Sequence, residues 1–117
     1  MRASVRISCD PGPEQSVIAL SGDCDEETEP ALTAALTKAL AGAPAVLVVD
    51  VAGLRFADST LLHALLEAWR TQKDGQRRLV VRGPFSVGVR RLLTETGTLD
   101  LFTDLPGQGH EDQGDAE

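Results

Sequence analysis

A continuous apolar run at positions 45–49, with the letters AVLVV, constrains the fold of this chain more than any other feature. Runs rich in β-branched residues that do not alternate with polar ones are typical of strands covered on both faces, which are usually parallel and central. Five residues are far too few to span a bilayer. Gly42 and Pro44 end the segment before the run. The run therefore predicts the central strand of an α/β sheet.

Three segments have the residue spacing of amphipathic helices. The first follows Thr28, a predicted N-cap, and has Pro30 in its first turn. Its apolar residues recur every three or four positions: Leu32, Ala35, Leu36, Ala39 and Leu40. The second covers residues 59–71, with Trp69 in its apolar stripe, and the third opens at Gly83-Pro84 and ends at Gly97. The third helix has an apolar face: Phe85, Val89, Leu92 and Leu93.

Strand patterns surround these helices. Residues 3–9 alternate between apolar and polar, a turn follows at 10–13, and residues 16–21 predict the returning strand of a hairpin. Residues 78–82 predict another strand, and residues 99–102 a short edge strand or closing turn. Two right-handed β-α-β crossovers make the inner strands parallel. The fold class is α/β: a small mixed sheet of four to five strands, with an antiparallel N-terminal edge strand and a parallel core, packed with three helices.

Length and charge limit the domain organisation. A chain of 117 residues without internal repeats predicts one domain, over residues 1–105. Residues 106–117 are rich in glycine, glutamine and acid, and we expect an acidic, disordered tail there. The net charge is −7, of which the tail carries −4, leaving −3 on the body. With three Phe, one Trp and no Tyr to stack on bases, the arginines at 77–91 do not predict nucleic-acid binding.

The cysteines and the N-terminus limit the function classes further. Cys9 and Cys24 lack C-x-x-C spacing and neighbouring histidines, which argues against a zinc site or a disulfide scaffold. We expect both to be buried or half-buried free thiols, and we expect no metal or cofactor. The first residues contain no apolar leader segment, so the sequence predicts a cytoplasmic protein without a membrane partner.

Functional groups in parallel sheets gather outside the carboxyl ends of the strands. Three segments are predicted to meet there: residues 22–25, a loop over residues 50–58 with Ser59 after it, and residues 82–84. Ser59 opens the second helix, where unpaired N–H groups and the helix dipole would receive a phosphate on its hydroxyl. Aspartates at 23, 25, 50 and 58 are predicted to lie close to Ser59. A phosphate there would add to their negative charge and repel an acidic surface on a partner. Taken alone, Asp58-Ser59 is more often a simple helix N-cap pair.

Residues 46–62, with the letters VLVVDVAGLRFADSTLL, resemble the signature of the STAS family. In that signature an apolar strand ends in Asp, a short loop carries an apolar-x-Phe step, and Asp-Ser-Ser/Thr-Gly-Leu opens a helix. Residues 22–25, GDCD, resemble the family's Gly-Glu-Leu-Asp turn, and residues 83–97 its fourth-strand exit and third helix. The resemblance covers about residues 3–105.

The resemblance implies an anti-sigma factor antagonist. In members of that class, the serine after the signature Asp, here Ser59, is phosphorylated by an anti-sigma factor that is also a serine kinase. The unphosphorylated protein binds the anti-sigma factor and frees the sigma factor, and a serine phosphatase restores binding. Thr60 is a second phospho-acceptor candidate. The implied partner-binding residues follow the matched turn and helix start: Asp23, Asp25, Asp58, Thr60, Leu61 and Leu62. The family often has glycine at position 61, which would let a partner's backbone approach the helix start closely.

Three other interpretations compete with this one. A hydrolase using Ser59 and His63 is disfavoured because the Gly-x-Ser-x-Gly elbow is missing, and we expect no enzyme and no catalytic residue. A receiver-like magnesium site would use Asp23, Asp25 and Asp50, but lacks a later Lys or Thr to hold an acyl phosphate. A STAS module that serves as a non-switching scaffold or ligand-binding unit in a signalling assembly stays open.

Overall fold

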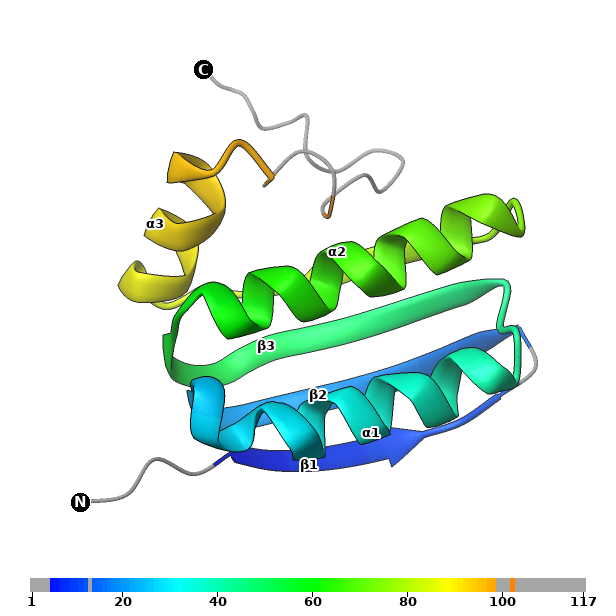
Figure 1. Ribbon diagram of the computed structural model, residues 1–117, viewed down its shortest axis with the longest axis horizontal. Helices are drawn as coiled ribbons and strands as arrows, with labels where there is room; N and C mark the ends of the chain where they lie inside the picture. Colours follow the sequence, from blue (N-terminus) through cyan, green and yellow to red (C-terminus); the bar gives the residue numbers. More distant parts are fainter. Residues whose placement is uncertain (1–4, 13, 99–101, 103–117) are drawn as a thin grey trace.

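The computed structural model describes residues 5–12, 14–98 and 102, which form a sheet with helices packed on it (Figure 1). The strands lie in the order β1-β2-β3-β4. In chain order the elements are β1 (Val5–Asp10), β2 (Gln15–Cys24), a 3₁₀ turn (Glu26–Thr28), α1 (Glu29–Ala41), β3 (Val46–Ala57), α2 (Ser59–Asp74), β4 (Arg78–Arg82) and α3 (Val87–Glu95). The pairing of β1 with β2 is antiparallel, and β2, β3 and β4 are mutually parallel. The predicted mixed sheet with three helices is confirmed.

The core lies between the sheet and the helices, with α1 and α2 side by side over one face (Figure 1). Ile18, Leu47 and Leu79 occupy neighbouring strands on that face and are almost completely buried. Val48 points to the opposite face and is still buried, because Val17 and Val80 flank it on the adjacent strands. The central position predicted for residues 45–49 is therefore correct.

Strand β3 is much longer than predicted. The expected loop over residues 50–58 is wrong, since the strand continues to Ala57 and stays paired with β2 up to Cys24. The register shifts twice along this stretch, and each shift places an extra residue on β3. Val51, Leu54 and Ala57 consequently face the core at intervals of three residues instead of two.

The helix starts differ from the predictions in detail. Thr28 precedes α1 but makes no side-chain cap there; it completes a capping box with Asp25 around the 3₁₀ turn. The third helix begins at Val87 and not at Gly83-Pro84, and the Ser86 hydroxyl accepts a hydrogen bond from the Val89 N–H at 3.3 Å. Gly97, at φ +72°, ends it as predicted.

Several predictions concern other parts of the chain. Cys24 is buried, but Cys9 is exposed, contrary to expectation. The predicted tail, 106–117, lies outside the described residues, as do 99–101 of the predicted final strand, whereas Phe102 is buried in the core. Among the described helices, none combines the length and apolarity that crossing a bilayer requires.

Candidate functional site

The strands β2 and β3 end side by side, and the chain leaves both at one edge of the sheet. Cys24 pairs with Ala57, and the Asp58 N–H donates a hydrogen bond to the Cys24 carbonyl at 3.2 Å. Asp25 and Asp58 therefore follow neighbouring strand ends. We call residues 23–28 and 55–60 the rim.

The third segment predicted for this edge lies elsewhere. Arg82 ends β4 opposite Asp50, which itself pairs with Ala19 of β2. The five residues from there to Cys24 place this pair roughly 16 Å below the rim. The Asp50 carboxylate accepts hydrogen bonds from Arg82 Nη2 at 3.0 Å and from the Ala52 N–H at 2.9 Å. Asp50 and residues 82–84 are therefore not part of the rim, and the expected meeting of three segments is wrong.

Ser59 is the first residue of α2 and is exposed. The preceding Asp58 is the N-cap, and its Oδ1 accepts a hydrogen bond from the Thr60 N–H at 2.9 Å. Its carbonyl accepts one from the Leu61 N–H at 3.0 Å. The Asp58 carboxylate thus already occupies part of the helix terminus that the sequence argument assigned to a phosphate. The dipeptide therefore caps the helix through Asp58, as the N-cap interpretation predicts, and Ser59 itself is exposed.

Asp25 holds the other half of the rim. Its Oδ1 accepts from the Glu27 N–H at 3.0 Å, its own N–H donates to Thr28 Oγ1 at 2.9 Å, and that hydroxyl donates to the Asp25 carbonyl at 2.8 Å. Next to it, burial raises the pKa of the Cys24 thiol to about 11, against a hydrogen bond with Thr28 that lowers it, and the charges of Asp58 and Asp25 raise it further. Two carboxylates therefore act on one buried thiol, so negative charge is concentrated here.

The remaining predicted partner residues divide into exposed and buried ones. The Asp23 carboxylate is half-exposed and lies 3.5 Å from Arg55 Nη2. Thr60 is half-buried. Leu61 is fully buried and Leu62 is 9% exposed, so their side chains pack in the core and do not present a contact surface. Because Leu61 points inward, it does not project over the helix start in the way that its departure from the family glycine suggested.

Two apolar side chains near the rim were missed as site residues. Phe56 is 50% exposed and Val87 is 76% exposed, both unusual for large apolar residues. The two residues are close because their chain neighbours are in contact: a Cβ on Gly88, which follows Val87, would lie 3.8 Å from the carbonyl oxygen of Arg55, which precedes Phe56. The sequence did contain a signal for Phe56, which belongs to the apolar-x-Phe step of the STAS signature. Its exposure could not be predicted, because it depends on the register shifts in β3.

The side chains invoked by the rival interpretations do not converge. His63 is exposed on α2, and among the described residues no hydrogen bond joins it to Ser59. Within the described part of the chain, no group of three His, Cys, Asp or Glu side chains is arranged to hold a metal ion. Asp50 is separated from Asp23 and Asp25 along the strands, as described above.

The chain matches a known protein family over most of its length. A family model described as "Mlab, STAS domain" matches residues 7–103. An anti-sigma factor antagonist from Mycobacterium paratuberculosis shares 30% identity, with a TM-score of 0.72 over 87% of this chain and 85% of that one. The anti-sigma factor antagonist SpoIIAA in its unphosphorylated form shares 22% identity, with a TM-score of 0.74 over 92% and 94%.

Phosphorylated SpoIIAA, a Bacillus cell fate determinant, shares 20% identity with a TM-score of 0.67 over 92% of this chain and 97% of that one. At these identities, the two SpoIIAA structures support the fold alone. No curated protein matches the chain.

Proposed function

The chain belongs to the STAS domain family, and from that premise we propose that it is an anti-sigma factor antagonist, a non-catalytic binding protein switched by phosphorylation of Ser59. The observation that carries the proposal is an exposed Ser59 hydroxyl at the start of α2, on a rim that also holds Asp25 and Asp58. The 30% identity with the Mycobacterium paratuberculosis antagonist supports the same class of function.

Phosphorylation would act on this rim through charge. A phosphoserine adds about −1.5 to −2 charges. Asp58 already uses its carboxylate to cap the Thr60 N–H, so a phosphate on the next residue must compete with that carboxylate or be repelled by it. Two unit charges about 6 Å apart near a protein surface interact by roughly 1–3 kcal/mol. An acidic group of the partner at a similar distance would be repelled by the same amount, which is enough to lower the partner's affinity by one or two orders of magnitude.

The partner surface that we propose is the exposed part of the rim. Asp23, Asp25, Asp58 and Thr60 supply its polar groups, while the buried Leu61 and Leu62 only hold the helix start in place. Phe56 and Val87 add apolar area, and partly exposed aromatic side chains often carry much of the energy of an interface. The proposed partners are an anti-sigma factor with serine kinase activity and a serine phosphatase, in the cytoplasm.

The test is the affinity of an anti-sigma factor kinase from the same genome for four forms of the protein: wild type, Ser59→Ala, Ser59→Asp and Ser8→Asp. Ser8 is exposed on β1 and provides the same chemical change away from the rim. We expect Ser59→Ala and Ser8→Asp to bind within about threefold of wild type, and Ser59→Asp to bind at least about tenfold more weakly.

A kinase assay separates the two acceptor candidates. Incubation with ATP should place an acid-stable phosphate on the wild type and on Thr60→Ala, but not on Ser59→Ala, as read by mass spectrometry. Equal affinity of Ser59→Ala and Ser59→Asp for the anti-sigma factor would contradict the switch. It would favour a STAS module that binds without switching.

A further inference from the structure

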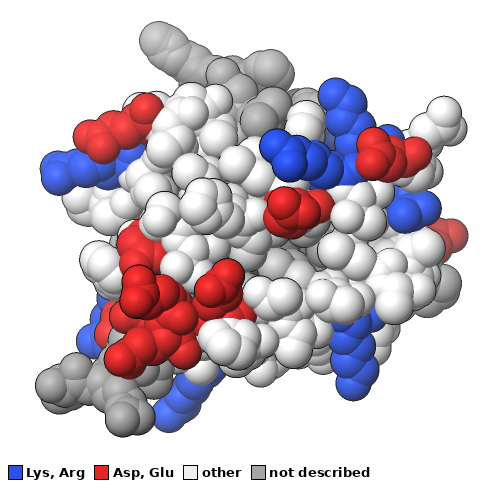
Figure 2. Space-filling model, viewed as in Figure 1, with Lys and Arg blue, Asp and Glu red and all other residues white. Residues whose placement is uncertain are grey.

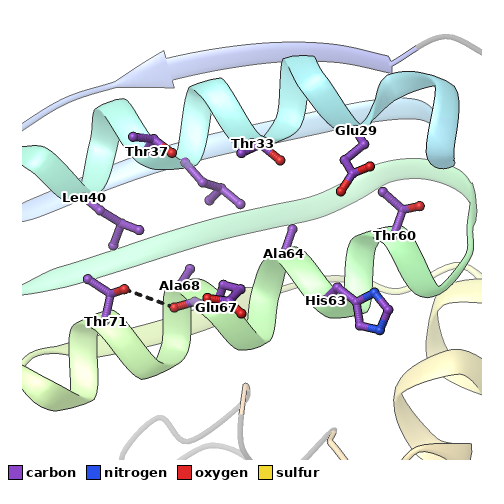
Figure 3. A pocket seen from close by; sticks show the side chains of 11 residues that line it. Glu29, Thr33, Thr37, Leu40, Thr60, His63, Ala64, Glu67, Ala68 and Thr71 are labelled. Carbon is purple, nitrogen blue, oxygen red and sulfur yellow. Dashed lines mark hydrogen bonds between the residues drawn. The ribbon is translucent and has the colours of Figure 1, made fainter.

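A groove with a volume of about 370 Å³ runs between α1 and α2 on the side away from the sheet. Its floor is apolar and small, formed by Leu36 and Leu40 of α1 and by Ala64 and Ala68 of α2 (Figure 3). In Figure 3, Leu40 points from α1 toward α2, and Ala64 and Ala68 point back toward α1. None of these side chains takes part in the rim.

The groove has the length and periodicity of a helix-binding site. Its lining extends from Glu29 to Leu40 on α1 and from Thr60 to Thr71 on α2. At a rise of 1.5 Å per residue, each stretch is about 16 Å long, or three helical turns. Thr33 and Thr37 repeat at an interval of four on one wall, as Ala64 and Ala68 do on the other. Short side chains at this spacing let a third helix approach closely.

The charge of the groove is negative. Glu29 and Glu67 line it, and none of its described lining residues is Lys or Arg. Glu67 has one weak ion pair, with Arg70 at 3.8 Å, in which both side chains are largely exposed. Glu26 and Glu27 precede Glu29 in the turn that enters α1, and Figure 2 shows acidic side chains gathered at that end of the helix pair.

We propose that this groove binds an amphipathic helix of a partner protein, about three turns long, with small or aliphatic residues on one face and Lys or Arg along its edges. The groove is open along its length, because Thr33, Thr37 and Thr71 are exposed, and this suits a helix better than an enclosed small molecule. The site lies on the helix layer and needs no phosphate. It is therefore a second binding surface, beyond the switch proposed for the rim.

The test uses two synthetic helical peptides of about 14 residues. Both have leucine and alanine on one face, and the other positions are lysine in one peptide and glutamate in the other. We expect the lysine peptide to bind the full chain at least about tenfold more tightly in fluorescence anisotropy. Amide shifts in two-dimensional NMR should gather over residues 29–40 and 60–71. Equal binding of the two peptides, no saturable binding, or shifts confined to residues 25–28 would overturn the proposal.

Matched variants keep the test specific to the groove. Thr33 lines it and Ala34 does not, and both are exposed on α1. Thr33→Arg should weaken binding of the lysine peptide by at least about tenfold, and Ala34→Arg should leave it within about twofold. Glu29→Gln should weaken it about two- to fivefold, with Glu95→Gln, exposed on α3 and outside the groove, as its control. Identical behaviour of the members of each pair would also overturn the proposal.

The outcomes for the groove and for the rim are distinguishable. Ser59 does not line the groove, so Ser59→Asp should not abolish binding of the lysine peptide. Conversely, Thr33→Arg should leave Ser59 a kinase substrate. A failed switch therefore leaves the groove result standing, and a failed groove leaves the switch standing.

Discussion

Replacing Gln72 with leucine tests how α2 is held at the end opposite Ser59. Gln72 is completely buried, although it is polar. Its Nε2 donates hydrogen bonds to the carbonyl oxygens of Pro44 at 3.0 Å and of Arg78 at 2.8 Å, and its Oε1 accepts one from Arg77 Nε at 3.1 Å. Pro44 precedes β3 and Arg78 begins β4. One amide therefore joins the end of α2 to the starts of β3 and of its edge neighbour β4.

The expected cost follows from these contacts. Leucine has a similar size, so the change removes three hydrogen bonds without opening a large cavity. A net contribution of about 1 kcal/mol for each hydrogen bond, plus the cost of leaving the buried Pro44 carbonyl without its Gln72 partner, less the gain from an apolar side chain, gives a loss of about 2–4 kcal/mol. For a domain of this size, the melting temperature should fall by roughly 8–16 °C.

Urea unfolding, followed by the fluorescence of the single tryptophan, Trp69, measures this loss. The control is Gln15→Leu, the same change at an exposed position of β2, which should stay within about 0.5 kcal/mol of wild type. Phosphorylation of Ser59 should be unaffected under folding conditions. A free energy of unfolding for Gln72→Leu within about 0.5 kcal/mol of wild type would refute the idea that this amide anchors the helix.

Two further predictions concern the strands beneath the rim. Because the pKa of Cys24 is raised from 9.0 to about 11, the unfolded chain loses this proton first, and the free energy of unfolding should fall between pH 9 and 11 by at most about 2–3 kcal/mol. Cys24→Ala should lack that part of the slope in urea titrations; an unchanged slope would contradict the assignment. A Cβ on Gly53 would lie 2.7 Å from the Ser21 Cβ, so Gly53→Ala should lose about 1–3 kcal/mol in the same assay. Gly42→Ala, where the nearest atom is 3.6 Å away, is its control, and an equal loss in both would refute the close packing.

The fold was predictable because its strongest signals are local. The apolar run at 45–49 identified the central strand, and the helical spacing from Leu32 to Leu40 identified α1. The parallel order then followed from the alternation of strands and helices. Each of these inferences depends on a period that the backbone enforces within one element.

The second half of β3 was not predictable in the same way. Apolar residues at 51, 54 and 57 fit neither a strand with period two nor a helix, so they were interpreted as a loop. The register shifts that produce this spacing arise from pairing with β2, a contact between distant parts of the chain. Because β3 extends beyond the end of β4, Asp50 pairs with Arg82 instead of reaching the rim. The wrong interpretation of the spacing at 51, 54 and 57 therefore led to wrong positions for Asp50 and for residues 82–84.

The candidate site also has a part that the sequence predicts and a part that it does not. That Ser59 begins a helix could be inferred from Asp58, a strong N-cap residue, at the preceding position. That Leu61 and Leu62 are buried while Phe56 is exposed could not, because those burials depend on the angle at which α2 leaves β3. The position of the Ser59 hydroxyl could be predicted from local capping, whereas the residues exposed beside it depend on tertiary packing.

The start of α2 belongs to both proposed binding surfaces. Ser59 faces solvent at the rim, and Thr60, the next residue, lines the end of the groove beside Glu29 (Figure 3). A phosphate on Ser59 adds negative charge to both. At the rim that charge repels acidic groups of a partner, whereas at the groove it adds to the carboxylates that attract a basic helix. One modification would therefore have opposite effects on an acidic partner at the rim and on a basic helix in the groove, so Ser59→Asp should bind the lysine peptide no more weakly than wild type.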